Sequence, residues 1–231
     1  MCSSDPPGAP LPAATPRPRI TEGVFFTTPP DLPHGPHGLA RDAVLGAQRE
    51  RSLIAATELL AATSSVRDIG IREIAREARL STSAFYRCYH DKESCLLAGH
   101  ARFVEVVHRS FIAALGSAAD WDEQAAAAVE SVLSLFSADP VTARAYLVGL
   151  EGLGEAARRR RRETITAMAT ALKNTRDTHW PGAEQLPVSA YEGAIVAIRH
   201  QVASALETAV DGDDLRRRTS EVLPSLARML A

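Results

Sequence analysis

The clearest chemical pattern in the sequence is a cluster of hydroxyl and basic side chains between Ile71 and Glu93. These side chains stand where a short helix and the turns beside it would expose them, and they are Ser81, Thr82, Ser83, Tyr86, Arg87 and Lys92. Hydroxyl, guanidinium and ammonium groups donate hydrogen bonds to phosphate oxygens, and an arginine can bind guanine through two bonds in the major groove. The cluster therefore predicts contacts with the backbone and bases of duplex DNA.

Two short helices joined by a tight turn would position this cluster. Apolar periodicity predicts helices over Ile71–Ala78 and Thr82–Tyr89. Arg79 and Leu80 would form the turn, and Ser81 would cap the second helix. Small or apolar residues occur where the two helices would cross, namely Ile74, Ala75, Leu80, Ala84 and Phe85. This is the geometry of a helix-turn-helix, whose second helix can enter the major groove.

Helical patterns also cover the rest of the chain after Leu39. The other predicted helices are Ala43–Thr63, a helix that Asp91 caps and that runs through Val107, and residues 122–137, 140–150, 153–177, 189–210 and 213–230. Pro140, Pro181, Pro187 and Gly212 mark joints between them. No segment alternates with a period of two, so the sequence predicts an all-α fold.

The segment around the two short helices resembles the DNA-binding domain of the TetR (tetracycline-repressor-like) family of bacterial regulators. The family's pattern occurs at the same spacing in Ile74-Ala75, Ala78–Ser81, Tyr86-x-x-Tyr89, Lys92-Glu93 and Leu96. Arg79 departs from it, because the family has a glycine in the turn, where a side chain is harder to accommodate.

This resemblance implies roles for single residues. Tyr86 and Lys92 match positions that grip phosphates. Thr82, Ser83 and Arg87 would project from the second helix and are the candidates for reading bases. For Arg87 a phosphate contact remains the alternative.

The resemblance also implies a domain organisation and a mode of action. Residues 41–95 would form a three-helix DNA-binding domain, and residues 96–231 a helical ligand-binding and dimerisation domain. The protein would bind a near-palindromic DNA operator as a homodimer, and an effector that prefers one of two conformations would release it. The alternative is a helical enzyme or adaptor in which the helix-turn-helix-like segment is purely structural; no catalytic motif stands out.

The C-terminal half supplies candidates for effector binding and dimerisation. The expected effector is small and largely apolar, with one or two polar anchors. Residues that could face its cavity are Trp121, Arg144, Tyr146, Glu151, Arg199 and His200. Apolar stripes at helical spacing predict a dimer interface of four helices that includes Tyr191, Ile195, Ile198, Val202, Leu206, Val222, Leu226 and Met229. The alternative is that both stripes pack only within one subunit.

Residues 1–40 differ from the rest in composition. They hold ten of the 14 prolines, which forbid a regular helix, so we expect a disordered or extended arm. Arg17 and Arg19 in this arm could enter a minor groove, although a plain tail is the simpler interpretation.

Charge and composition set outer limits on function. The formal net charge is −2, but residues 41–110 carry eleven basic against nine acidic side chains, so only the expected DNA-binding region is positive. The sequence has no secretory signal, no apolar run of the ~18 residues that a membrane span needs, and three cysteines, which together fit a cytoplasmic protein. The spacing of the histidines predicts no metal site, and we expect no cofactor.

Two further features have a simple and a functional interpretation. The five arginines Arg158–Arg162 are expected to be a solvated helix face paired with Glu155 and Glu163, with a binding patch as the alternative. Cys88 and Cys95 flank the turn after the second short helix, where inert packing is expected and a redox switch is the alternative.

Overall fold

The computed structural model describes residues 18–30, 40–63, 65–115, 121–149, 154–182 and 184–220. Within these residues all regular structure is helical, which confirms the all-α prediction. The α-helices are α1 Arg41–Thr63, α2 Ile71–Glu77, α3 Thr82–Cys88, α4 Lys92–Leu115, α5 Trp121–Ala138, α6 Pro140–Leu147, α7 Gly154–His179, α8 Val188–Thr208 and α9 Gly212–Ser220. One 3-10 turn, η1 Val66–Asp68, precedes α2 and was not predicted.

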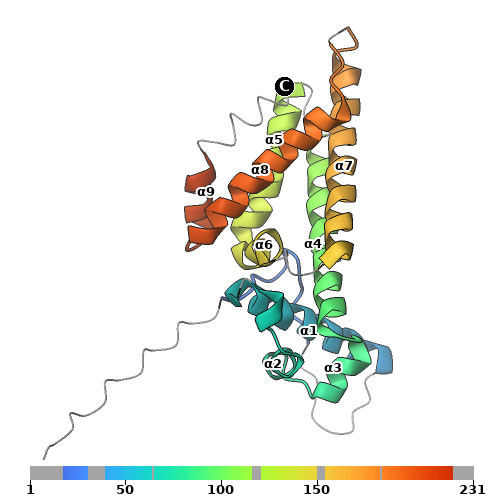
Figure 1. Ribbon diagram of the computed structural model, residues 1–231, viewed down its shortest axis with the longest axis vertical. Helices are drawn as coiled ribbons and strands as arrows, with labels where there is room; N and C mark the ends of the chain where they lie inside the picture. Colours follow the sequence, from blue (N-terminus) through green and yellow to red (C-terminus); the bar gives the residue numbers. More distant parts are fainter. Residues whose placement is uncertain are drawn as a thin grey trace, which may run out of the picture.

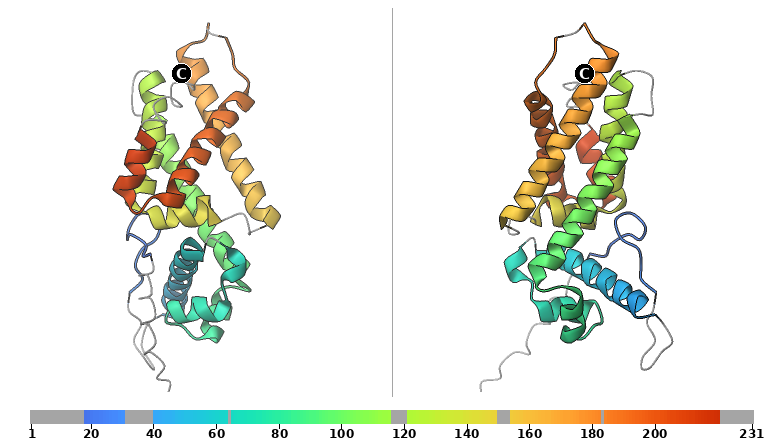
Figure 2. Two further views of the ribbon diagram at one scale, coloured as in Figure 1. Left: turned by 60° about the vertical axis from the view of Figure 1, so that its left-hand side comes forward. Right: turned by 90° about the vertical axis from the view of Figure 1, so that its right-hand side faces the viewer.

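The helices form two groups that share α4. Helices α1, α2 and α3 lie at one end of the molecule, and α5 to α9 surround the upper part of α4 (Figure 1). Helix α4 runs through both groups and packs against α1 on one side and against α5 and α7 further along (Figure 2). The expected boundary at residue 95 therefore falls inside the first turn of a continuous helix.

Local hydrogen bonds explain where several helices begin. The Ser81 hydroxyl accepts a bond from the Ala84 N–H at 3.1 Å and caps α3, as predicted. Asp91 caps α4 in a reciprocal pair, since its carboxylate accepts from the Ser94 N–H and its own N–H donates to the Ser94 hydroxyl. Asp139 caps α6 directly before Pro140, which suits the first helical position.

The turn between α2 and α3 is a Schellman motif with an arginine at its left-handed position. Arg79 has φ +55°, and its N–H donates to the carbonyl of Arg76. The Leu80 N–H donates to the carbonyl of Ala75 at 2.8 Å. These two bonds satisfy the last carbonyls of α2, and they require the conformation that glycine adopts at least cost. The turn thus holds an arginine in the left-handed conformation that favours glycine.

Residues 18–30, which we call the strap, differ from the expected free arm. Phe25 and Phe26 are only 4% and 2% exposed, and the ring of Phe25 lies 5.1 Å from that of Phe103 on α4. Arg19 forms ion pairs with Glu58 on α1 and Glu77 on α2, at 2.8 and 2.9 Å. Prolines exclude a helix here but do not prevent packing, and burial of two phenylalanines stabilises an extended segment. The remaining arm residues, 1–17 and 31–39, lie outside the described residues.

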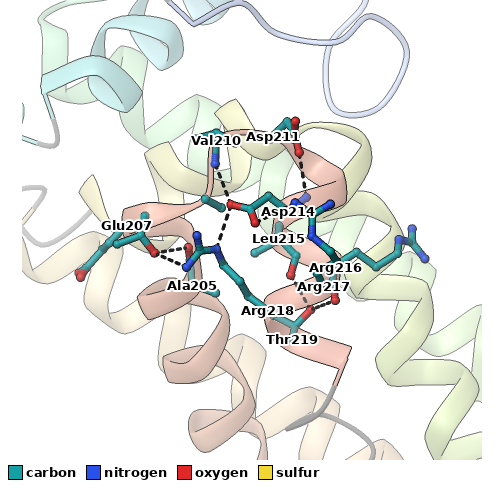
Figure 3. A network of polar contacts seen from close by, with 12 residues as sticks. Ala205, Glu207, Val210, Asp211, Asp214, Leu215, Arg216, Arg217, Arg218 and Thr219 are labelled. Carbon is teal, nitrogen blue, oxygen red and sulfur yellow. Dashed lines mark hydrogen bonds and ion pairs between the residues drawn. The ribbon is translucent and has the colours of Figure 1, made fainter.

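Helix α9 is fixed to the end of α8 by a polar network (Figure 3). Asp214 accepts from the Val210 N–H and from the guanidinium groups of Arg217 and Arg218. Arg218 also donates to the Thr208 hydroxyl at the C-terminal end of α8. This network positions α9 beside α8, so that the two helices close one side of the C-terminal helix group.

The described part of the chain contains neither a membrane-spanning helix nor a metal site. None of its helices has an apolar segment long enough to cross a membrane. No group of three or more potential ligands among its His, Cys, Asp and Glu residues is arranged to hold a metal ion.

Candidate DNA-binding surface and ligand cavity

Helix α3 buries one face and exposes the predicted DNA-binding side chains on the other. Ala84 and Phe85 are buried, and Phe85 packs edge-on against Tyr86 and tilted against Tyr89. The exposed side chains are those of Ser81, Thr82, Ser83, Tyr86 and Arg87, with Tyr86 54% exposed. An exposed helix with hydroxyl and guanidinium donors, held rigidly from behind, can be placed in a major groove.

Lys92 has a second role that the sequence did not reveal. Its ammonium group donates to the carbonyls of Val66 and Ile69, at 2.8 and 2.9 Å. These bonds tie the start of α4 to η1 and to the residue that directly follows it. Two of the three N–H donors of the ammonium group are thus used inside the protein. A phosphate contact by Lys92 stays a prediction, and it would use the third donor.

The C-terminal helix group encloses an apolar cavity of about 110 Å³ that is partly open to solvent. Side chains from α4, α5, α6, α7 and α8 line it, and most are apolar: Phe103, Val104, Val107, Phe111, Val129, Val132, Leu133, Phe136, Leu147, Ile165, Met168, Ile195, Ile198 and Val202. The remaining lining residues are polar, namely His100, Tyr146, Arg161, Thr164 and Arg199. A lining with so few polar groups suits an apolar molecule.

Only part of the predicted effector set lies at this cavity. Tyr146 and Arg199 line it, whereas His200, one residue further along α8, points outward and is exposed. Trp121 is buried elsewhere in the core. Arg144 donates to the carbonyls of Glu207 and Ala209 and so closes the end of α8, which makes it a structural residue. Glu151 lies outside the described residues.

The sequence did not predict three polar residues of the cavity, because their neighbours in sequence gave no sign of a cavity. These residues are His100, Arg161 and Thr164. His100 lies on the buried face of α4, which looks like ordinary core in the sequence. Arg161 belongs to the arginine run, whose other members Arg158, Arg159 and Arg162 pair with Glu155 or Glu163 as a solvated face. The solvated-face interpretation is therefore confirmed for those three arginines and wrong for Arg161.

The polar lining residues change the electrostatics at His100. Its side chain is 2% exposed, and its Nδ1 has no hydrogen-bond partner in the described structure. Burial, together with the positive charges of Arg160, Arg161 and Arg199, lowers the pKa of His100 to about 4. The imidazole is therefore neutral at pH 7 and lies in a positive potential.

Tyr146 connects the cavity with the group of helices that contains the helix-turn-helix. Its hydroxyl lies 2.7 Å from that of Thr57 on α1. Because the Thr57 hydroxyl donates to the carbonyl of Leu53, it accepts from Tyr146. Burial raises the pKa of Tyr146, so the phenol stays protonated and can donate.

The stripe predicted for the dimer interface packs inside one subunit instead. Tyr191, Ile195, Val202 and Leu206 are buried in the single chain, and Ile195, Ile198 and Val202 line the cavity. A stripe that fills the subunit's own core is unavailable to a partner, which corrects this part of the prediction. Val222, Leu226 and Met229 lie outside the described residues.

The two described cysteines are poor candidates for redox chemistry. Cys95 is buried and its thiol donates to the carbonyl of Ser52 at 3.6 Å. Burial raises the pKa of both Cys88 and Cys95, so neither forms the reactive thiolate readily. The structure therefore favours inert packing over a switch.

Comparison with known proteins bears on the fold. No protein-family model and no curated protein matches the sequence. Among solved structures, the chain is similar to a fatty acid degradation regulator, FadR, from Bacillus halodurans, with 14% identity over 79% of this chain and 94% of that one and a TM-score of 0.66. It is also similar to a TetR-family transcription regulator from Marinobacter aquaeolei VT8, with 18% identity over 79% and 93% of the chains and a TM-score of 0.59.

A third similar structure contains a ligand. It is the transcriptional regulator FadR from Bacillus subtilis in complex with stearoyl-CoA, with 18% identity over 78% of this chain and 96% of that one and a TM-score of 0.62. At these identities the likeness is one of fold. The chain thus has the all-α fold of TetR-type regulators, with a helix-turn-helix at its N-terminal end, as the sequence resemblance implied.

Proposed function

We propose that this protein is a transcriptional regulator that binds a near-palindromic DNA operator as a homodimer in the cytoplasm and responds to a small, largely apolar effector. The observation that carries the proposal is the outer face of α3, where Thr82, Ser83, Tyr86 and Arg87 are exposed together on a capped and well-packed helix. The fold shared with transcriptional regulators supports it.

The arrangement supports distinct roles for these side chains. Thr82, Ser83 and Arg87 would reach base edges, while Tyr86 and the remaining donor of Lys92 would bind phosphates on either side of them. Arg87 already lies 3.4 Å from the Ser83 hydroxyl, four residues before it, so both donors face the same way. A guanidinium group that binds guanine through two bonds contributes about 1–3 kcal/mol of discrimination.

The test is operator binding by the wild type and an Arg87→Ala variant. The operator is first selected from random duplexes, and affinity is then measured for it and for random DNA over a range of salt. We expect Arg87→Ala to lower the affinity for the operator by roughly ten- to a hundredfold and the affinity for random DNA much less. Arg159→Ala removes the same charge from the solvated face of α7 and is the control.

Two outcomes would contradict the proposal. One is that no duplex is selected above background by the wild type. The other is that the wild type binds all duplexes equally with affinity that does not fall as salt rises, since phosphate contacts release counterions.

The effector belongs in the apolar cavity. Because a protein of the same fold binds stearoyl-CoA, long-chain acyl compounds are the first class to screen. Release of the selected operator by a compound that also raises the melting temperature would support the switch. A compound set in which no member does both would count against it.

A further inference from the structure

The polar residues of the cavity gather on three helices, and their charges have one sign. His100 comes from α4, Arg161 and Thr164 from α7, and Arg199 from α8. Two of these side chains are guanidinium groups, and the described lining residues include no carboxylate. Arg160 and both lining arginines are close enough to His100 for their charges to act on it, so the positive groups lie at one place in the cavity.

The arginine side chains are held so that they can receive an anion. Arg199 donates one N–H to the carbonyl of Leu147 at 3.0 Å, which fixes the guanidinium group beside the end of α6. Arg161 is half-buried on the neighbouring helix. A guanidinium group has five N–H donors in a planar fork that matches the two oxygens of a carboxylate.

His100 supplies an independent sign of a missing partner. It is almost completely buried, lines the cavity, and leaves Nδ1 without a partner in the described structure. A buried polar atom without a hydrogen bond is unfavourable. A ligand with polar atoms at this place would satisfy Nδ1, and the Thr164 hydroxyl could bond to it as well.

We propose that the cavity binds an amphiphile with an anionic headgroup, whose carboxylate lies between Arg161 and Arg199 beside His100 and whose apolar chain extends past Val107 and Met168. The apolar wall accounts for the chain, and the two guanidinium groups account for the charge. An uncharged apolar effector would bring no opposite charge to these guanidinium groups, whereas a carboxylate would. This inference rests on the proposed function, because it names the class of effector.

The experiment compares three probes that share one chain: dodecanoate, dodecan-1-ol and dodecanoyl-CoA. Their affinities for the full-length protein are measured directly by calorimetry, without DNA. We expect dodecanoate to bind at least tenfold more tightly than dodecan-1-ol. Tighter binding of dodecanoyl-CoA than of dodecanoate would show that the arginines bind the phosphates of the CoA moiety. That result would overturn the carboxylate assignment.

Variants assign the headgroup to its residues. Arg161→Gln is expected to lower the affinity for dodecanoate at least tenfold and to leave the affinity for dodecan-1-ol unchanged. Arg199→Gln should change the affinity for dodecanoate in the same direction. Arg159→Gln, on the same helix but paired with Glu163 in solvent, is the matched control and should bind both probes like the wild type.

Equal affinity of the wild type for dodecanoate and dodecan-1-ol would overturn the inference. So would an Arg161→Gln variant that keeps the wild-type preference, provided that its circular dichroism shows a folded protein. Selection of an operator by the wild type is measured separately, so failure of the ligand class and failure of DNA binding can be distinguished.

Discussion

Among single residues, Tyr146 links the two halves of the molecule most directly. Its ring lines the cavity, while its hydroxyl donates to Thr57 on α1, the long helix behind the helix-turn-helix. Gly99 is needed for this contact, because a Cβ there would lie 1.9 Å from the Tyr146 hydroxyl. A ligand that moves the ring would therefore act on the position of α1.

Tyr146→Phe is expected to separate effector binding from DNA release. The ring remains, so effector affinity should change less than threefold, but release of the operator should need a much higher effector concentration. Loss of one buried hydrogen bond should lower the free energy of unfolding by about 1 kcal/mol. Fluorescence anisotropy of labelled operator during effector titration measures the coupling.

Tyr191→Phe is the control for that experiment. Tyr191 is also buried, but its hydroxyl has no partner in the described structure. The coupling role of Tyr146 would be ruled out if both variants released DNA at the wild-type effector concentration.

His100 predicts a dependence of stability on pH. Its pKa is about 4 in the folded protein, against about 6.5 in the unfolded chain. Between these values the unfolded chain binds a proton that the folded protein does not, so the free energy of unfolding falls as pH falls from 6.5 to 4. The full contribution is about 3 kcal/mol, present above pH 6.5.

Urea unfolding at pH 7, 5.5 and 4.5 measures this effect. His100→Gln should flatten the profile over that interval, whereas His108→Gln, at a partly exposed side chain on the same helix, should leave it unchanged. Identical profiles for wild type and His100→Gln would show that other groups cause the acid sensitivity.

At the scale of helices, the sequence was most informative where signals are local. Ser81, Asp91 and Pro140 act within one turn of chain, so they located the starts of α3, α4 and α6 correctly. The stripe on α8 shows which residues are buried but not whether the partner is the same subunit or another. Whether neighbouring Arg199 or His200 faces a cavity depends on packing from four other helices, which periodicity cannot supply.

The turn after α2 carries a prediction of its own. Arg79→Gly should raise the free energy of unfolding by about 1 kcal/mol, because a residue with a Cβ is strained at φ +55°. Arg76→Gly, in the last turn of α2, should lower it by about the same amount, since glycine weakens a helix. Both variants lose one exposed arginine, and urea denaturation compares them. A destabilised Arg79→Gly would mean that the arginine side chain makes compensating contacts.

For the whole molecule, the strap, α4 and Tyr146 all join the helices α1, α2 and α3 to the cavity. Phe25 of the strap packs on Phe103, which itself lines the cavity, while Arg19 holds α1 and α2. The sequence did not predict that the strap packs against the helices, because its prolines exclude a regular helix but do not show whether an extended segment is buried. These connections favour coupled movement of both helix groups over independent movement of two domains.

Dimerisation is predicted at the outer face of α8. Gly193 and His200 are exposed there, and Val196 is 49% exposed, an apolar side chain that a partner would cover. Val196→Glu should give monomers at micromolar concentration by light scattering and should weaken operator binding. Val210→Glu, at an exposed valine between α8 and α9, should remain dimeric. A wild-type protein that is monomeric at that concentration would contradict the prediction.

The strap also limits how this protein can be recombined with related ones. A sensor assembled by exchanging the N-terminal 95 residues for those of another regulator would cut α4 in its first turn. It would also remove Phe25 and Phe26 while keeping Phe103 and Arg102, the side chains that they pack against. A junction placed after Phe103 transfers the strap together with these partners. In such chimaeras the crossover point, more than the choice of recognition helix, should decide whether ligand response survives.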